Sequence, residues 1–209
     1  MDHYNVLVLG GGAGGVAAAI RAAQFGGKVA VVEDKFLGGL CMNRGCVPFG
    51  HMLEASRILG SLDLGREMGI EVEDPGVNFA TLMKRQNELV TFMRQGVHGL
   101  LNKRKVDLFK GRGRLAGPGK AQVGGKTLSA DKIILAAGSR WLEPEIPGHD
   151  LPGVVNSDYL LTAKALPGRC RNQLWSFSSG VPQGEAWGIK ITSAPPRAIT
   201  VLISGKWAS

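Results

Sequence analysis

Two of the three cysteines in the chain, Cys41 and Cys46, are separated by only four residues. Thiols at this spacing can form a disulfide that takes up and releases electrons, share a metal ion, or remain as small apolar groups in a core. A structural zinc site needs four ligands, and the remaining cysteine, Cys170, lies in a region of different composition, so we expect no metal site. The spacing by itself leaves a redox role and a structural or incidental role equally open.

A disulfide between these two thiols would place a condition on the backbone. On a regular helix five residues advance about 7.5 Å along the axis, whereas the Cα atoms of a disulfide lie no more than about 7 Å apart. The segment must therefore contain a distorted turn if it is to be bridged. Gly45 and Pro48 are residue types that permit one.

A glycine pattern near the start of the chain is typical of dinucleotide binding. Gly10, Gly12 and Gly15 follow a short apolar strand and precede an alanine-rich helix, with the spacing G-x-G-x-x-G. In such a motif the first glycine permits a tight turn, the second lets a pyrophosphate approach the backbone, and the third lets the helix pack on the strand. The unpaired N–H groups and the positive dipole at the start of the helix would bind the phosphates.

An acidic residue stands where a dinucleotide site requires one. Glu33 lies eighteen residues after Gly15, at the end of the next apolar segment, and is placed to accept hydrogen bonds from a ribose. The strand, the helix, the glycines and the acid together predict an adenine dinucleotide, although the motif does not choose between FAD and NAD.

The elements that must position these residues follow from the apolar pattern. Asn5–Leu9 predicts a strand, and Val16–Phe25 predicts a helix that stops at a pair of glycines. Lys28–Glu33 predicts a second, buried strand, which completes a βαβ unit. Residues 36–49 form a predicted turn region that leads into a further helix.

Two more elements are predicted further along the chain. Phe79–Lys103 has apolar residues at three- and four-residue steps and Asn78 as its N-cap, which indicates a long helix. Residues 106–136 are interrupted by glycines and predict an antiparallel meander, with a buried strand over Lys132–Ala136. We therefore expect an α/β fold, with a Rossmann-like parallel sheet, a β-meander and a long helical excursion between about residues 45 and 104.

Composition limits the class of protein. The chain has 209 residues, of which 44% are hydrophobic and 20% charged, as in globular proteins. No apolar run is long enough to cross a bilayer and no basic segment of a secretory signal is present, so we expect a cytoplasmic protein without a membrane partner. The net charge is +8, and from Ala163 onward six basic residues accompany one acid. Because most of the excess lies in this last part, we expect no nucleic-acid partner.

The character of the chain changes near Gly168. Three of the four tryptophans follow it, no helical period continues, and serine and proline are scattered. We expect residues 1–166 to form a nucleotide-binding domain that carries the cysteine pair. Residues 167–209 are expected to form an atypical tail, outside that fold, that packs poorly or frays.

These motifs together resemble the flavin-dependent pyridine nucleotide-disulfide oxidoreductase family, and within it the dihydrolipoamide dehydrogenase branch. The resemblance covers residues 4–166 and rests most specifically on the cysteine segment, Gly38-Gly39-Leu40-Cys41-Met42-Asn43-Arg44-Gly45-Cys46-Val47-Pro48. It also includes the glycine motif, Glu33, and the stretch Ile133–Ser139 followed by Ile146-Pro147-Gly148.

The resemblance implies that the dinucleotide is FAD and that NAD is the co-substrate. Cys41 would exchange with the substrate disulfide, and Cys46 would face the flavin. The reaction implied is the oxidation of dihydrolipoamide to lipoamide with reduction of NAD to NADH, in a homodimer. The partner would be a small dithiol or disulfide, carried by a domain of a 2-oxo acid dehydrogenase complex. The residues implied to contact the cofactor are Gly10, Gly12, Ala13, Gly14, Gly15, Glu33, Gly39, Leu40, Gly113, Ala137, Gly138 and Ser139.

The sequence departs from the family pattern at several positions. The family has a lysine that contacts the flavin ring where Gly50 stands, and we expect His51, one position further, to be an ordinary helix residue. Family threonines are replaced by Leu40 and Ala137. Nothing after Pro167 resembles the family's NAD-binding or dimer-interface domains, which predicts a truncation or a change of reading frame.

Two alternative hypotheses stand beside this one. The chain can be a catalytically inactive FAD-binding fragment or a frameshifted product, which the missing lysine and the foreign tail favour. It can also be a relative of glutathione or mercuric reductase, because in the family the choice of substrate lies largely in regions that have no counterpart here.

Overall fold

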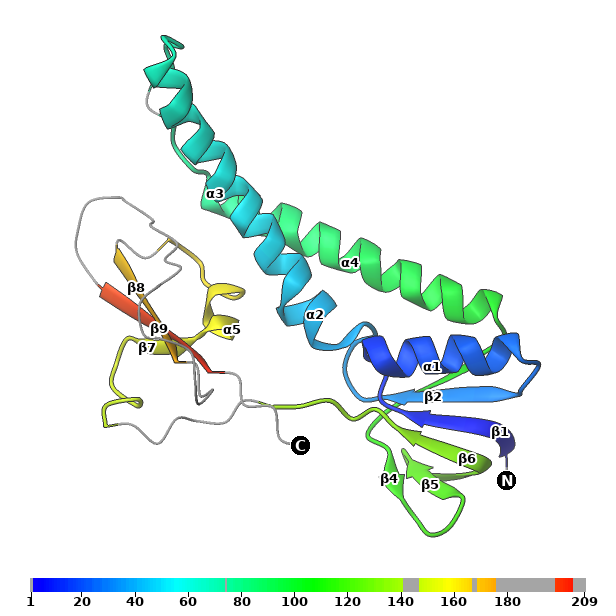
Figure 1. Cartoon of the computed structure of the whole chain (residues 1–209). Helices are drawn as coiled ribbons and strands as arrows, with labels where there is room; N and C mark the ends of the chain where they lie inside the picture. Colours follow the sequence, from blue (N-terminus) through cyan, green and yellow to red (C-terminus); the bar gives the residue numbers. More distant parts are fainter. Residues whose placement is uncertain (1, 74, 141–146, 167–168, 176–197, 205–209) are drawn as a thin grey trace, which may run out of the picture. The chain divides into compact units, whose positions relative to one another are not determined.

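The computed structural model describes residues 2–73, 75–140, 147–166, 169–175 and 198–204. The chain divides into two compact units (Figure 1). One unit combines residues 1–52 with 85–139, and the other combines residues 53–84 with 140–209. Because all the predicted site residues belong to the first unit, it is described first.

The first unit opens with the predicted βαβ arrangement. β1 (Asp2–Leu9) and β2 (Val29–Glu33) pair in parallel, with Val6 opposite Val29, and α1 (Ala13–Gln24) connects them. The prediction of these three elements is confirmed. The helix begins three residues earlier than predicted, inside the glycine motif, because Gly12 adopts the extended conformation of an N-cap.

A six-stranded sheet is built around this unit, in the order β3-β2-β1-β6-β5-β4. β3 (Asp107–Lys110) adds to β2 in parallel. β4 (Arg114–Leu115), β5 (Lys120–Val123) and β6 (Lys126–Leu135) form the predicted antiparallel meander. From Leu128 to Leu135, β6 also pairs in parallel with β1, so a single strand belongs to both the meander and the parallel sheet.

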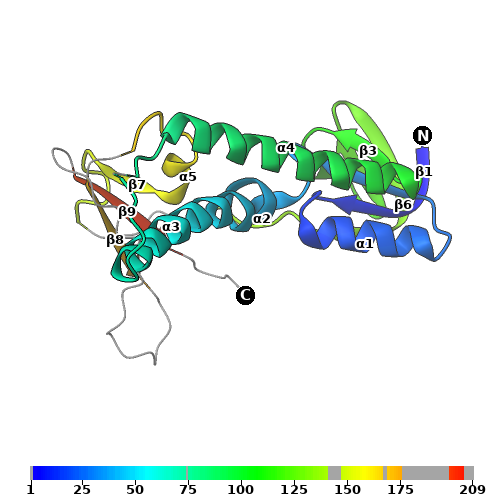
Figure 2. The ribbon, with the colours of Figure 1, turned by 90° about the horizontal axis from the view of Figure 1, so that it is seen from above.

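Side chains of β1 alternate between two apolar clusters, as the two-residue period of a strand requires. Leu7 and Leu9 contribute to a cluster with the meander, whereas Val8 contributes to a cluster with α1 and the end of α4. Figures 1 and 2 both show α1 and α4 on one side of the sheet. The prediction of a strand over Lys132–Ala136 is confirmed as far as Leu135, but its burial is only partial. Ile133 and Ile134 pack against the two clusters, whereas Lys132 is exposed and Leu135 is 63% exposed.

Two long helices follow the cysteine segment. α3 (Cys46–Glu67) is continuous over 22 residues, and α4 occupies Phe79–Lys103, the bounds predicted from the sequence. The Asn78 side chain accepts a hydrogen bond from the N–H of Thr81 at 2.9 Å, which confirms the N-cap. These two helices form the predicted helical excursion.

The second unit contains a small parallel sheet in the order β7-β9-β8. Its strands are β7 (Val154–Asn156), β8 (Arg169–Trp175) and β9 (Ala198–Ser204), and α5 (Ser157–Leu160) follows β7. The expectation that the tail packs poorly falls largely outside the described residues, and the boundary at residue 166 stays a prediction. No helix in the described ranges has the length and apolar character needed to cross a membrane.

Candidate dinucleotide and dithiol site

The glycine turn after β1 is dictated by contact between backbones. Gly10 has φ of +112°, and a Cβ atom there would overlap the carbonyl oxygen of Ala136. A Cβ atom on Gly15 would overlap the carbonyl oxygen of Gly10. Only glycine fits at these two positions, which confirms the tight turn and the close packing of helix on strand predicted from the motif.

The first turn of α1 leaves its N–H groups without a side-chain cap. Gly12 caps the helix without a side-chain hydrogen bond, and the first turn contains no acidic residue. Ala13 and Gly14 are exposed, and a Cβ atom on Gly14 would meet nothing within 4 Å. The N–H groups at the start of this helix, together with its dipole, are therefore open to a phosphate.

Glu33 lies at the end of β2 and binds the glycine turn directly. Its Oε2 atom accepts a hydrogen bond from the N–H of Gly11 at 2.7 Å, and its Oε1 atom accepts one from the N–H of Lys35 at 2.8 Å. Each carboxylate oxygen can accept a second hydrogen bond. The predicted contact with a ribose is therefore compatible with the observed ones and stays a prediction.

The cysteine segment is joined to the glycine turn through the backbone. The N–H of Gly38 donates to the carbonyl oxygen of Gly11 at 2.8 Å. Gly39 has φ of +62°, and a Cβ atom there would lie only 2.8 Å from the Cα atom of Gly12. The fold thus brings the glycine turn and the first residues of the cysteine segment into direct contact.

The predicted distorted turn between the two cysteines is confirmed. α2 (Gly39–Arg44) carries Cys41 and ends at Gly45, whose ψ of −115° interrupts the helix before α3 begins at Cys46. A Cβ atom on Gly45 would lie 3.3 Å from the Cα atom of Cys41, closer than an ordinary contact. Pro48 is buried in the first turn of α3, where its missing N–H is not needed.

The two thiols are unbridged, exposed and in contact. A hydrogen bond with the Cys46 sulfur is the main reason why the pKa of Cys41 is raised above its ordinary value. Desolvation and the charge of Cys46 add to this rise, whereas the backbone N–H of Cys46 opposes it. The contact between the two sulfurs therefore disfavours the thiolate form of Cys41.

Sequence reasoning missed a polar contact that holds the thiol helix. The Nδ2 atom of Asn43 donates to the carbonyl oxygens of Leu37 at 2.9 Å and Gly39 at 2.8 Å, and its Oδ1 atom accepts from Nε of Arg94. The guanidinium of Arg94 lies 3.8 Å from the ring centre of Phe36, and burial lowers the pKa of Arg94. The sequence indicates this contact only through the position of Arg94, which lies on the same helical face as the buried apolar residues of α4.

The remaining predicted cofactor residues surround the same turn. Gly113 lies against β1 and β2, where a Cβ atom would be 2.9 Å from Cδ2 of Leu9. Ala137, Gly138 and Ser139 follow β6, and the N–H of Ala136 donates to the carbonyl oxygen of Leu9 at 2.8 Å. Their contacts with adenine and flavin stay predictions, as do the roles of Gly39 and of Leu40, which is 54% exposed.

The start of α3 shows what replaces the family lysine. A Cβ atom on Gly50 would meet nothing within 4 Å, so a longer side chain has room there. The Nε2 atom of His51 is buried and has no hydrogen-bond partner among the described residues. The expectation that His51 is an ordinary helix residue stays a prediction.

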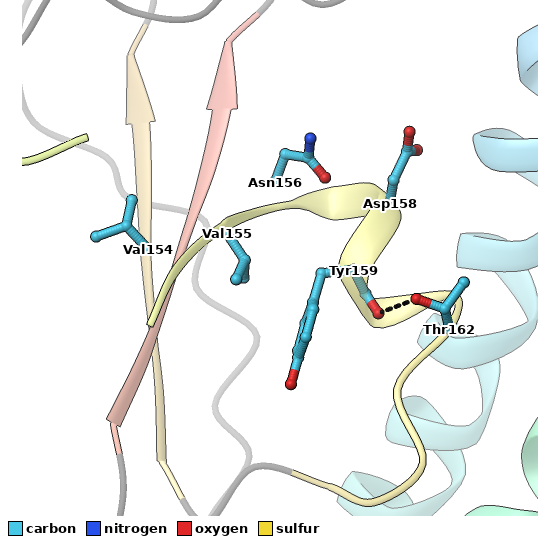
Figure 3. A pocket seen from close by; sticks show the side chains of 6 residues that line it. All are labelled: Val154, Val155, Asn156, Asp158, Tyr159 and Thr162. Carbon is cyan, nitrogen blue, oxygen red and sulfur yellow. Dashed lines mark hydrogen bonds between the residues drawn. The ribbon is translucent and has the colours of Figure 1, made fainter. Parts of the chain in front are cut away.

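A second hollow lies in the other unit and shares no residue with this site. It is shallow and is lined by Val154, Val155, Asn156, Asp158, Tyr159 and Thr162 (Figure 3). Within this lining the Thr162 hydroxyl donates to the carbonyl oxygen of Tyr159 at 3.1 Å. Without a nucleophile or a set of converging charges, this hollow is a weaker candidate site than the glycine turn.

Known proteins are similar to this chain in sequence and in fold. The family model described as pyridine nucleotide-disulphide oxidoreductase matches residues 4–170. Dihydrolipoyl dehydrogenase of Acholeplasma laidlawii is 34% identical over 170 residues, which are 79% of this chain and 51% of the relative. Dihydrolipoyl dehydrogenase 3 of Pseudomonas putida is 45% identical over 162 residues, 74% of this chain and 33% of the relative. The chain therefore spans between a third and a half of these relatives.

Two further proteins show how broad the similarity is. Mercuric reductase of Lysinibacillus sphaericus is 31% identical over 169 residues, 80% of this chain and 31% of that protein. The solved structure of the HOCl-induced flavoprotein disulfide reductase RclA from Escherichia coli superposes with a TM-score of 0.66 and 26% identity. That match covers 81% of this chain and 36% of the other.

Proposed function

This chain belongs to the pyridine nucleotide-disulphide oxidoreductase family, a family of oxidoreductases, and on that premise we propose that it binds FAD and carries a redox-active thiol pair. The observation that carries this proposal is the contact between the two motifs. Gly38 hydrogen bonds to Gly11, and Gly39 packs on Gly12, so a dinucleotide on the glycine turn would lie beside Cys41 and Cys46.

The residues present fit FAD. The open first turn of α1 would hold the pyrophosphate, Glu33 the adenosine ribose, and the turn at Gly138 the flavin side. When bound, FAD supplies an acceptor for the two electrons of a reduced thiol pair. The chain's own part is to bind the phosphates with N–H groups and to hold the two sulfurs in contact with each other.

The thiol chemistry follows from the exposure of the two cysteines and from the contact between their sulfurs. In the direction of substrate oxidation, a thiolate of a small dithiol attacks Cys41 of the Cys41–Cys46 disulfide, and Cys46 leaves as a thiolate. The second substrate thiol then displaces Cys41, so a substrate disulfide forms as the protein disulfide is reduced. Two electrons and two protons pass to the protein pair. Exposure of both cysteines gives a small substrate access to them.

We further propose the dihydrolipoyl dehydrogenase type of reaction, with NAD as the final acceptor and a lipoamide-type dithiol as substrate. The named relatives of Acholeplasma and Pseudomonas support this choice. A carrier domain of a 2-oxo acid dehydrogenase complex, a homodimer and a cytoplasmic location belong to the same proposal. Residues 1–166 are proposed as the functional domain, with residues 167–209 outside it.

The first test is retention of flavin by the purified chain. The chain is mixed with FAD, desalted, and its visible absorption compared with its protein absorption. About one flavin per chain is expected, and reduction with dihydrolipoamide should then bleach the flavin band. If FAD is retained but only glutathione or mercuric ion reacts at the thiols, the lipoamide assignment fails.

A matched pair of variants locates the cofactor. A Cβ atom on Gly12 would lie 3.6 Å from the Cα of Gly39, an ordinary contact that the protein tolerates. Gly12→Ala should therefore fold but lose flavin, because the methyl group occupies the place of the pyrophosphate. Gly96→Ala on α4, which meets nothing within 4 Å, should retain it. Retention of flavin by Gly12→Ala would place the pyrophosphate elsewhere. Absence of flavin in the unmodified chain would instead favour the alternative of an inactive remnant.

A further inference from the structure

The helix that carries Cys41 is not held by the hydrophobic core. None of the six residues of α2 is buried, and Leu40 and Cys41 are exposed. Apolar packing therefore contributes little to the position of the Cys41 sulfur. The position must depend on directed polar contacts and on the two glycine-defined ends of the helix, Gly38 and Gly45.

Asn43 supplies those polar contacts from inside the thiol helix. Both of its amide hydrogens are used, one toward the carbonyl oxygen of Leu37 and one toward that of Gly39. Leu37 is 8% exposed and belongs to the apolar cluster beneath α1 and α4. Asn43 therefore ties the exposed helix to a residue that the core does hold.

Arg94 determines which way the Asn43 amide faces. A guanidinium can only donate hydrogen bonds, so the contact of its Nε atom selects Oδ1 of Asn43 and leaves Nδ2 for the two carbonyl oxygens. If the amide were reversed, an N–H group would face the guanidinium and an oxygen would face two carbonyls. Every one of these contacts would then be repulsive.

Arg94 is itself fixed by its surroundings. It follows Val90 and precedes Val97 at four- and three-residue steps on the face of α4 that is turned inward. Its planar group stacks 3.8 Å from the centre of the Phe36 ring. A side chain held on both sides in this way can transmit the position of α4 to the thiol helix.

We propose that Arg94 is a positioning residue for the thiol pair: acting through Asn43, it fixes the orientation of α2 and thereby the stability of the Cys41–Cys46 disulfide. This inference rests on the proposed redox role of the pair, and on neither FAD nor any particular substrate. It predicts that removing Arg94 changes the redox equilibrium of the thiols without unfolding the chain.

The test is equilibration of the whole chain with mixtures of reduced and oxidised dithiothreitol. The Cys41–Cys46 bond forms while the ring disulfide of oxidised dithiothreitol opens to two thiols, which receive the two electrons and two protons. Alkylation followed by mass analysis of tryptic peptides measures the oxidised fraction. Trypsin cuts after Arg44, so the two cysteines are separated unless they are bridged.

In the Arg94→Gln variant the equilibrium constant for disulfide formation should fall about tenfold, the effect of losing one hydrogen bond to a charged group. That change corresponds to a reduction potential about 30 mV less negative. Arg85→Gln is the matched control. Arg85 lies on the same helix, is exposed, and its guanidinium pairs with Glu88. It should leave the potential unchanged.

A double variant separates positioning from general loosening. If Arg94 acts through Asn43, Arg94→Gln combined with Asn43→Ala should shift the potential no further than Asn43→Ala alone. Should Arg94→Gln fail to fold, Arg94→Lys keeps the charge but not the planar fork, and the same direction of shift is expected.

Two results would overturn the inference: a potential in Arg94→Gln and Arg94→Lys that equals that of the unmodified chain, or effects that simply add in the double variant. If the unmodified chain forms no Cys41–Cys46 disulfide at any dithiothreitol ratio, the redox function itself fails and this role with it. That outcome is distinguishable, because it appears before any substitution is made.

Discussion

The glycine turn and the thiol helix touch each other, yet different forces hold them. At Gly10 and Gly15 any side chain would overlap a backbone carbonyl, so sterics alone specify the turn. α2, in contrast, buries none of its residues and depends on hydrogen bonds to Asn43 and on glycine ends. The glycine turn, which would bind the cofactor, is thus fixed by steric contact. The thiol helix, which would react, is held by individual hydrogen bonds that can break one at a time.

This difference suits the chemistry proposed for the two regions. A phosphate site needs N–H groups that do not move, because their advantage over water lies in being already oriented. A thiol pair must alternate between two unbridged sulfurs and a bond, with a corresponding change in the distance between them. A short exposed helix allows that change without disturbing the sheet beneath it.

The largest loss of stability is expected at Gly15, where the turn leaves no space for a side chain. Gly15→Ala should destabilise the chain by about 3 kcal/mol or more, because backbone atoms must move to relieve the overlap with Gly10. Gly14→Ala, where nothing lies within 4 Å, should be neutral or stabilising by up to about 1 kcal/mol. Urea unfolding followed by circular dichroism measures both, and equal stabilities would contradict the steric account.

A smaller effect is expected at the acid that binds the turn. Glu33→Gln replaces one accepting oxygen by an NH₂ group, which would face the N–H of Gly11 or of Lys35. The expected loss is about 1.5 kcal/mol, typical of a hydrogen bond to a charged group. Asp34→Asn, a neighbouring exposed acid, is the control and should change stability by no more than about 0.5 kcal/mol. A neutral Glu33→Gln would mean that the carboxylate does not order the turn.

On the thiol side, the start of α3 should accept a longer side chain. Gly50→Lys is expected to stabilise the helix by about 0.5–1 kcal/mol, because glycine is a poor helix former and the site is open. Gly50→Ala should give a similar gain in thermal unfolding. If the flavin ring lies close to position 50, as the family pattern implies, only the lysine variant should also retain more FAD after desalting. A lysine variant that loses flavin would place the ring elsewhere.

The smallest structural change is expected from a substitution at the thiols, where only the pKa of the remaining cysteine should change. In Cys46→Ala, Cys41 loses the hydrogen bond and the neighbouring charge that raise its pKa, so its pKa should fall. Because the thiolate is the form that alkylates, the pH midpoint of Cys41 modification by iodoacetamide should shift to lower pH. Peptide mass analysis follows Cys41 separately from Cys170. An upward shift, or none, would show that the two sulfurs do not share a proton.

Several features of the fold could be predicted because they follow from local rules. The βαβ unit, the meander and the bounds of α4 are determined by apolar periodicity and by residues such as Asn78 that end or begin a helix. The break at Gly45 follows from the reach of a disulfide compared with the rise of a helix. The exposure of Leu135 could not be predicted, because the same apolar residues are compatible with a buried strand end and with an exposed one.

The sequence by itself determined which groups this protein has for chemistry: a glycine motif typical of a tight turn, an acid at the end of a strand, and two thiols in a segment that must bend if they are to be bridged. Only the tertiary structure decided how those groups are held together. Gly39 meets Gly12, Glu33 binds Gly11, and Arg94 reaches Asn43 from 51 residues away. The physical reason is that helix capping and apolar periodicity act between residues close in the sequence, whereas these contacts exist only after the sheet and helices have packed.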